Sequence, residues 1–197
     1  MRRALATCLL LAAAAPAQAI YIADNGDGSA TLRGALDKGD GDVFRKFIES
    51  PRARPIKVVY LDSNGGEIGA GIAIGEQVRR LKLATAVKAQ TAICYSSCTL
   101  IFAGGVRRYN IGGDKVYPGL TGLSGLGYHP ANIRGDRVRV SVKSQQGTDL
   151  MNRFYAAMGQ PGAANLSRGA AFDTLFHPSG GQTLELKIAT SLGEPAE

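Results

Sequence analysis

The sequence is poor in the residues that bind metals or build disulfide scaffolds. Its 197 residues include only three cysteines and two histidines. No group of cysteines and histidines has the spacing of zinc ligands, so we expect neither a metal nor a cofactor. Cys8 lies in an N-terminal leader, which leaves Cys94 and Cys98, and two cysteines are too few for a disulfide framework. The pair could bridge or stay as two buried thiols, and the sequence leaves both open.

Long apolar runs are also missing. The run from Ala4 to Ala15 is too short for a bilayer-spanning helix, which needs about 20 apolar residues, and no later segment comes closer. Arg2 and Arg3 precede the run, and Ala17-Gln18-Ala19 follows it with the small residues of a cleavage site. This order is typical of a secretory signal peptide. We therefore expect cleavage after Ala19, with residues 20–197 forming one periplasmic or secreted domain.

The positive charge is not arranged as in proteins that bind nucleic acid. The formal net charge is +7, but the basic residues are scattered and are not interleaved with aromatic side chains. A solvated basic surface explains that pattern better than a nucleic-acid interface does. Export makes a nucleic-acid partner less plausible still, and we predict none.

A βαβ unit occupies the middle of the chain. Ile56 to Leu61 is almost wholly apolar, as in a strand buried on both faces of a parallel sheet. Asp62-Ser63-Asn64-Gly65-Gly66 follows as a turn, and apolar residues at helical spacing then run from Ile68 to Leu81. Ala84 to Val87 returns as a strand. This order implies a parallel sheet with a right-handed crossover, and hence an α/β fold.

The remaining elements are predicted from shorter patterns. Residues 20–30 are polar and read as an unpaired lead-in to a strand at Thr31 to Ala35. Helices are expected over Asp42 to Ser50, with Asp42 as the N-cap, and over the segments Gln145 to Met158 and Ala163 to Ala171. Arg107 to Ile111 and Leu123 to Tyr128 read as strands, as does Leu184 to Ser191.

Cys94-Tyr95-Ser96-Ser97-Cys98 is the sharpest candidate for a functional site. It lies between a strand-like run and the apolar stretch Thr99 to Ala103, which is typical of a fully buried helix. A serine there could act as a nucleophile, because a helix N-terminus offers free backbone N–H groups and a positive dipole end. Serine is also a favoured capping residue, and taken alone the turn is better explained as a helix cap.

Three motifs together resemble the Clp-protease and crotonase superfamily, most closely its exported, Clp-protease-like bacterial members. They are Ser63-Asn64-Gly65-Gly66, the Cys94–Cys98 turn, and Gly127-Tyr128-His129 at a strand end. Their order and spacing match the family from about Thr31 to His129. The resemblance implies a single α/β domain of stacked ββα units.

The resemblance also implies a role for each matching residue. Ser96 corresponds to the nucleophile and His129 to the general base that takes its proton. Gly66 and Ser97 correspond to the two backbone N–H groups of the oxyanion hole. Asp173 is the nearest match to the aspartate that orients the histidine, although a backbone carbonyl or water could hold the ring instead.

Several alternatives to this assignment remain. His177 is interpreted as structural and kept as a fallback base. Lys88 and Lys143 are candidates for a Ser-Lys pair, as in the related signal peptide peptidase A. The implied function is an exported serine hydrolase, a peptidase that acts on peptides or proteins as a homo-oligomer, without an ATP-dependent unfoldase. The competing interpretation is a catalytically inactive binding or assembly protein of the same fold.

Overall fold

The computed structural model describes residues 20–51, 54–115, 125–134, 141–171 and 173–195. The predicted signal peptide and its cleavage site lie outside these ranges. A five-stranded sheet in the order β1-β2-β3-β4-β6 forms the centre of the molecule. Its strands are β1 Tyr21–Asp24, β2 Ser29–Arg33, β3 Val58–Asp62, β4 Ala84–Lys88 and β6 Arg108–Ile111. All neighbouring strands are parallel except β1, which pairs antiparallel with β2.

Two smaller sheets and a set of helices complete the fold. The small sheets are β5 Ile93–Tyr95 with β7 Gly125–Gly127, which are parallel, and β8 Asn132–Arg134 with β9 Ser141–Lys143, which are antiparallel. The helices are α1 Asp40–Glu49, α2 Ile68–Arg80, α3 Cys98–Gly104, α4 Gln145–Ala157, α5 Pro161–Gly169 and α6 Gly180–Glu185, with a 3₁₀ turn, η1, at Gly113–Lys115. No helix in the described part of the chain is long and apolar enough to cross a bilayer.

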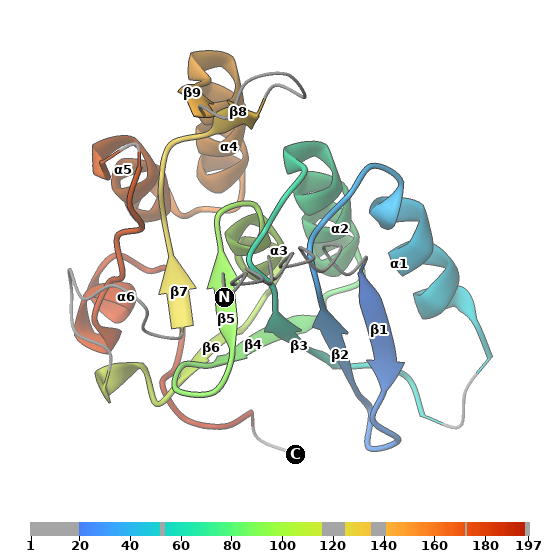
Figure 1. Ribbon diagram of the computed structural model, residues 1–197. Coiled ribbons are helices and arrows are strands. Elements are labelled where there is room, and N and C mark those ends of the chain that lie inside the picture. The colour runs from blue at the N-terminus through green and yellow to red at the C-terminus, as the bar shows by residue number, and fades with distance from the viewer. Residues whose placement is uncertain (1–19, 52–53, 116–124, 135–140, 172, 196–197) are drawn as a thin grey trace, which may run out of the picture.

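The main core lies between the large sheet and helices α1 to α3 (Figure 1). Side chains alternate along each strand, so one set faces the helices and the other faces the opposite side. The helix-facing set includes Leu32, Val59 and Val87, each fully buried. Tyr60, Ala86 and Tyr109 belong to a second, smaller apolar cluster on the other face. The sheet therefore has one deeply covered face and one partly open face.

Helix α3 is held deep in this core by close backbone packing against α2. All seven of its residues are buried, as the unbroken apolar run predicts. At the crossing point, a Cβ on Gly104 would collide with the backbone of Gly75. Only glycine allows the two helices to approach so closely here. Gly71 has the same role at the start of α3, because a Cβ there would lie 2.5 Å from the Ser97 carbonyl oxygen.

Two predictions about the ends of the chain are wrong. The polar lead-in contains a paired strand, because β1 adds to the sheet edge beside β2 through its own backbone hydrogen bonds. Leu184 to Ser191 is not a strand, because α6 covers its start and only an isolated bridge joins Ser191 to Tyr109. A capping box begins α6: Ser179 caps the amide of Gln182, whose side chain bonds back to the Ser179 amide.

The predicted cap of α1 is also wrong. The helix begins two residues earlier than expected, with Gly39 rather than Asp42 at the N-cap. Gly39 has a φ of 96°, a left-handed conformation that glycine adopts without steric cost. Asp42 instead lies in the first turn, where its negative charge interacts favourably with the positive end of the helix dipole.

Candidate active site

Ser96 lies at the tip of a tight turn between β5 and α3, with a backbone conformation that serine rarely adopts. Its φ is 53°, in the left-handed region, where a side chain meets the following carbonyl. The turn is fixed on both sides: the Ser96 amide donates to the Gly127 carbonyl at 2.9 Å, and the Ser96 carbonyl accepts from the Thr99 amide at 2.9 Å. Strained residues of this kind cluster at functional sites.

A disulfide spans this turn. Cys94 in β5 and Cys98 at the start of α3 are bonded, with their Cα atoms 5.2 Å apart. Both cysteines are fully buried in the main core. The bridge therefore joins the centre of β5 to the first residue of α3, on either side of Ser96.

The glycine turn after β3 packs directly against the serine turn. Ser63 bonds on both sides of Cys94, since its amide donates to Ile93 and its carbonyl accepts from Tyr95. A Cβ built on Gly65 would lie 2.5 Å from the Tyr95 carbonyl oxygen and 2.9 Å from the Ser96 Cβ. Real Cβ atoms do not approach so closely, so this position requires glycine. The contact brings two motifs thirty residues apart in sequence into a single site.

Two backbone N–H groups at this contact have no acceptor among the described residues. Within the described part of the chain, neither the Gly66 amide nor the Ser97 amide makes a hydrogen bond. A Cβ on Gly65 would lie 3.0 Å from the Ser97 nitrogen, so the two turns meet at these amides. Free amides are expected in the first turn of a helix, but here a second one comes from a separate turn. Such paired donors can bind a developing oxyanion.

His129 lies two residues after β7, the strand whose Gly127 carbonyl accepts the hydrogen bond from the Ser96 amide. Its Nδ1 lies 2.6 Å from the Pro130 carbonyl oxygen. Because a carbonyl only accepts, Nδ1 carries the proton and Nε2 is left as the basic nitrogen. Burial lowers the pKa of His129, and the hydrogen bond to Pro130 opposes this in part. The ring is therefore neutral near pH 7. Among the residues described, no hydrogen bond joins it to Ser96.

Asp173 and His177 occupy different surroundings. Asp173 is exposed, and the described residues include no hydrogen bond or ion pair between it and His129. His177 is 1% exposed, with Nδ1 bonded to the Leu126 carbonyl at 3.0 Å and its ring edge-on to Tyr95 at 5.1 Å. Burial also lowers its pKa. These contacts hold the His177 ring against β7 and Tyr95, beside the serine turn.

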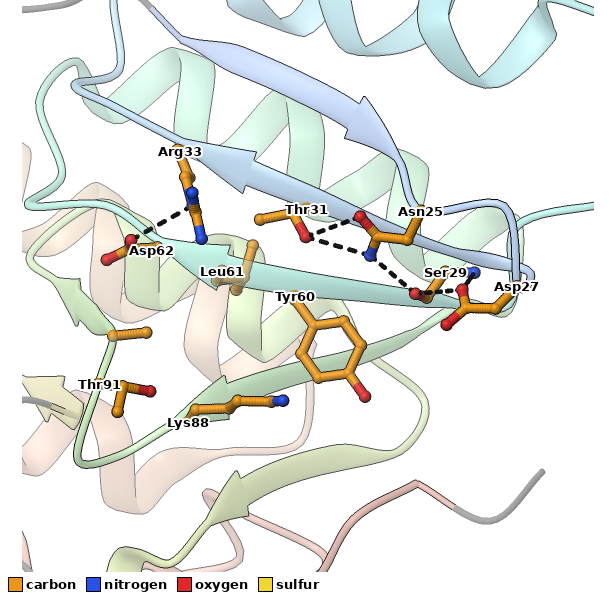
Figure 2. Close-up of a pocket in the computed structure, with 11 residues that line it drawn as sticks. Asn25, Asp27, Ser29, Thr31, Arg33, Tyr60, Leu61, Asp62, Lys88 and Thr91 are labelled. Atoms are coloured by element: carbon orange, nitrogen blue, oxygen red, sulfur yellow. Dashed lines mark hydrogen bonds and ion pairs between the residues drawn. The ribbon is translucent and has the colours of Figure 1, made fainter.

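Lys88 lies on the open face of the main sheet, in a polar hollow of about 320 Å³. Figure 2 shows its side chain beside the Tyr60 ring, whose centroid lies 5.4 Å from the ammonium nitrogen. Asp62, at the rim of the hollow, pairs with Arg33 at 3.5 Å. Lys143 is exposed on β9. Neither lysine makes a hydrogen bond to Ser96 within the described ranges.

Sequence reasoning missed the buried polar pair that supports the serine turn. The Thr99 hydroxyl lies 2.5 Å from the Tyr155 hydroxyl, and it also contacts the Ser96 carbonyl. Tyr155 belongs to α4 and is fully buried, which raises the pKa of its phenol and keeps it protonated. No motif marks Tyr155, because only the docking of α4 brings it to the turn. No group of three or more His, Cys, Asp or Glu gathers among the described residues as metal ligands would.

Comparison with known proteins supports the fold and not a particular family. No protein-family model and no curated protein matches the chain. A mutant of the 1510-N membrane-bound stomatin-specific protease has a similar structure, with 13% identity, a TM-score of 0.59, and coverage of 83% of this chain and 76% of that one. A putative enoyl-CoA hydratase from Streptomyces avermitilis has 11% identity over 89% of this chain and 67% of its own, with a TM-score of 0.44, too low to bear on the fold. This chain is thus a single α/β domain with the Clp-protease and crotonase fold.

Proposed function

We propose that this protein is an exported serine hydrolase of the peptidase type, with Ser96 as nucleophile and His129 as general base. The observation that carries the proposal is the pair of unbonded amides, Gly66 and Ser97, where the glycine turn meets the serine turn. A helix cap alone would need neither the second turn nor the left-handed serine. Together they provide a nucleophile and an anion site at one point.

The chemistry follows from the positions of these groups. The Ser96 hydroxyl attacks the substrate carbonyl carbon while its proton passes to Nε2 of His129. The carbonyl oxygen becomes an oxyanion that accepts from the two amides. Collapse breaks the scissile bond, the leaving amine takes the proton from His129, and water then hydrolyses the acyl-enzyme by the same route. Substrate binding would have to bring the ring to Ser96, because catalytic hydrogen bonds are often long in free enzymes.

Pro130 takes the place of a carboxylate in this proposal. Its carbonyl fixes the His129 tautomer that leaves Nε2 basic, which is one function of the third residue in a triad. It does so without a full negative charge, so it stabilises the imidazolium less than an aspartate would. Asp173 stays a prediction for that role.

The expected substrates are peptides or protein segments that reach the turn unfolded. We propose a periplasmic or secreted location and a homo-oligomer, both expectations from the sequence and its resemblance. An unfoldase driven by ATP has no place outside the cytoplasm, so the substrates would be short or already unfolded. No metal or cofactor enters the proposed reaction.

Labelling by a fluorophosphonate probe tests the proposal. Mature wild-type protein should label at one site, identified as Ser96 by mass spectrometry, and Ser96→Ala should not label. Ser97→Ala is the matched control, because it removes the neighbouring hydroxyl and keeps the amide. Equal labelling of wild type and Ser96→Ala, or none in either, would refute the catalytic proposal.

A non-catalytic binding or assembly role is the second candidate, and one observation favours it. In the described structure the His129 ring bonds to its own neighbour, Pro130, and not to Ser96. His129→Ala separates the two roles. If His129 is the general base, its removal should lower the labelling rate by about 10²–10⁴-fold. A non-catalytic binding protein would not be labelled in the first place.

A further inference from the structure

We propose that the Cys94–Cys98 disulfide is a positioning element for the nucleophile: it holds Ser96 in its left-handed conformation and keeps the Ser97 amide aimed at the oxyanion. This inference rests on the proposed hydrolase function. It assigns the two cysteines a role in the reaction beyond packing, although neither touches the substrate.

The bridge spans the three residues that the reaction would use. It connects the centre of β5 to the first residue of α3 and encloses Tyr95, Ser96 and Ser97. Ser96, the central residue, has a φ of 53°. Serine has no intrinsic preference for this conformation, so the surrounding structure must impose it.

Hydrogen bonds fix only part of the turn. The Ser96 amide and carbonyl are both bonded, and the Ser97 carbonyl accepts from Leu100 at 3.1 Å. Among the described residues, the Ser97 amide has no acceptor and the buried Ser97 hydroxyl has no partner. An oxyanion donor has to be free to bind the substrate oxygen, so the Ser97 N–H is oriented only indirectly, through the Ser96 carbonyl of the same planar peptide and through the ends of the turn. The disulfide holds the two ends of the turn, Cys94 and Cys98, without using the Ser97 N–H.

Burial of the sulfurs favours a permanent support over a rapid switch. Both cysteines are 0% exposed. A thiolate can attack a disulfide only when it reaches a sulfur atom, so reduction requires the turn to open first. An external dithiol would then supply two electrons and two protons, giving two cysteine thiols and an oxidised reagent. The folded protein should therefore resist dithiol reductants that reduce exposed disulfides.

Removal of the bridge tests the inference. The double variant Cys94→Ala/Cys98→Ala should label with fluorophosphonate about ten- to a hundredfold more slowly, the size of effect expected from misplacing a reacting group by about 1 Å. For a peptide ester, kcat should fall while KM stays within about threefold, because the substrate contacts remain. The acid limb of the pH profile should keep its midpoint, since His129 is untouched.

Controls separate positioning from a general loss of stability. Phe44→Leu changes a buried side chain on α1, away from the turn, and should lower stability with labelling kept within about twofold. Cys94→Val/Cys98→Ala keeps more of the buried volume and provides a second form of the test if the first variant does not fold.

Three outcomes decide between the inference and the function beneath it. Slow labelling in both bridge variants, with Phe44→Leu unchanged, supports the positioning role. Wild-type rates in a folded bridge variant overturn that role and leave the hydrolase intact. Absence of labelling in the wild type overturns both.

Discussion

Gly65→Ala is the substitution to which the contact between the two turns should be most sensitive. The added methyl group would lie 2.5 Å from the Tyr95 carbonyl oxygen and 3.0 Å from the Ser97 nitrogen. These neighbours are backbone atoms in a turn closed by a disulfide, so they cannot move aside as a flexible side chain could. Gly65 also has a φ of 87°, which alanine adopts only with strain.

The expected magnitude has two parts. The left-handed conformation costs alanine about 1–2 kcal/mol, and forcing an extra methyl group into a packed site costs about 1–3 kcal/mol. Gly65→Ala should therefore lose about 2–5 kcal/mol. Gly26→Ala is a matched control, because its φ is 81° and nothing lies within 4 Å of its added Cβ. The control should lose only the first part.

Thermal unfolding and labelling measure the two consequences separately. For a domain of this size, 1 kcal/mol shifts Tm by about 2–4 °C, so the control should fall by about 2–8 °C and Gly65→Ala by clearly more. Gly65→Ala should also slow fluorophosphonate labelling, because moving the glycine turn displaces the Gly66 amide. Equal Tm shifts in the two variants would refute the argument from close packing.

Three further outcomes follow from individual groups. Burial lowers the pKa of His129, and the reaction needs its neutral form, so the acid limb of kcat/KM should fall with a midpoint below the ordinary value of 6.5; a midpoint above 6.5 contradicts the assignment. Ser97→Ala should change stability by less than about 0.5 kcal/mol in urea unfolding, because its hydroxyl has no partner in the described part of the chain. Ser63→Ala loses the bond from the Gly65 amide and should cost about 1 kcal/mol. Arg108→Ala should cost about 3 kcal/mol or more, because the Arg108 guanidinium donates to the Ile188, Gly105 and Lys187 carbonyls. The control Arg33→Ala removes a side chain that is 65% exposed and should cost less than about 0.5 kcal/mol. Similar losses in the two variants would show that the carbonyl bonds of Arg108 contribute little.

The sequence by itself determined the elements whose pattern is local. The β-branched run of β3, the helical spacing of α2 and the unbroken apolar run of α3 each encode their own structure and burial. The order of these elements was enough to predict the parallel sheet. Glycine at the strand ends likewise indicated where the chain turns sharply, because few other residues tolerate left-handed conformations.

Only the tertiary structure decided which distant groups meet. β1 is only four residues long and runs into a polar, glycine-rich turn, and it becomes a strand because β2 offers it an unpaired edge. Leu184 to Ser191 has a strand-like composition, but a capping box begins a helix ahead of it, and Arg108 then binds the carbonyls of Lys187 and Ile188. The approach of the Gly66 amide to the Ser97 amide depends on how two separate turns pack, whereas the disulfide and the contact of His129 with Pro130 each form within one short segment. Local patterns encode how each segment folds, whereas the geometry of the site depends on contacts between segments.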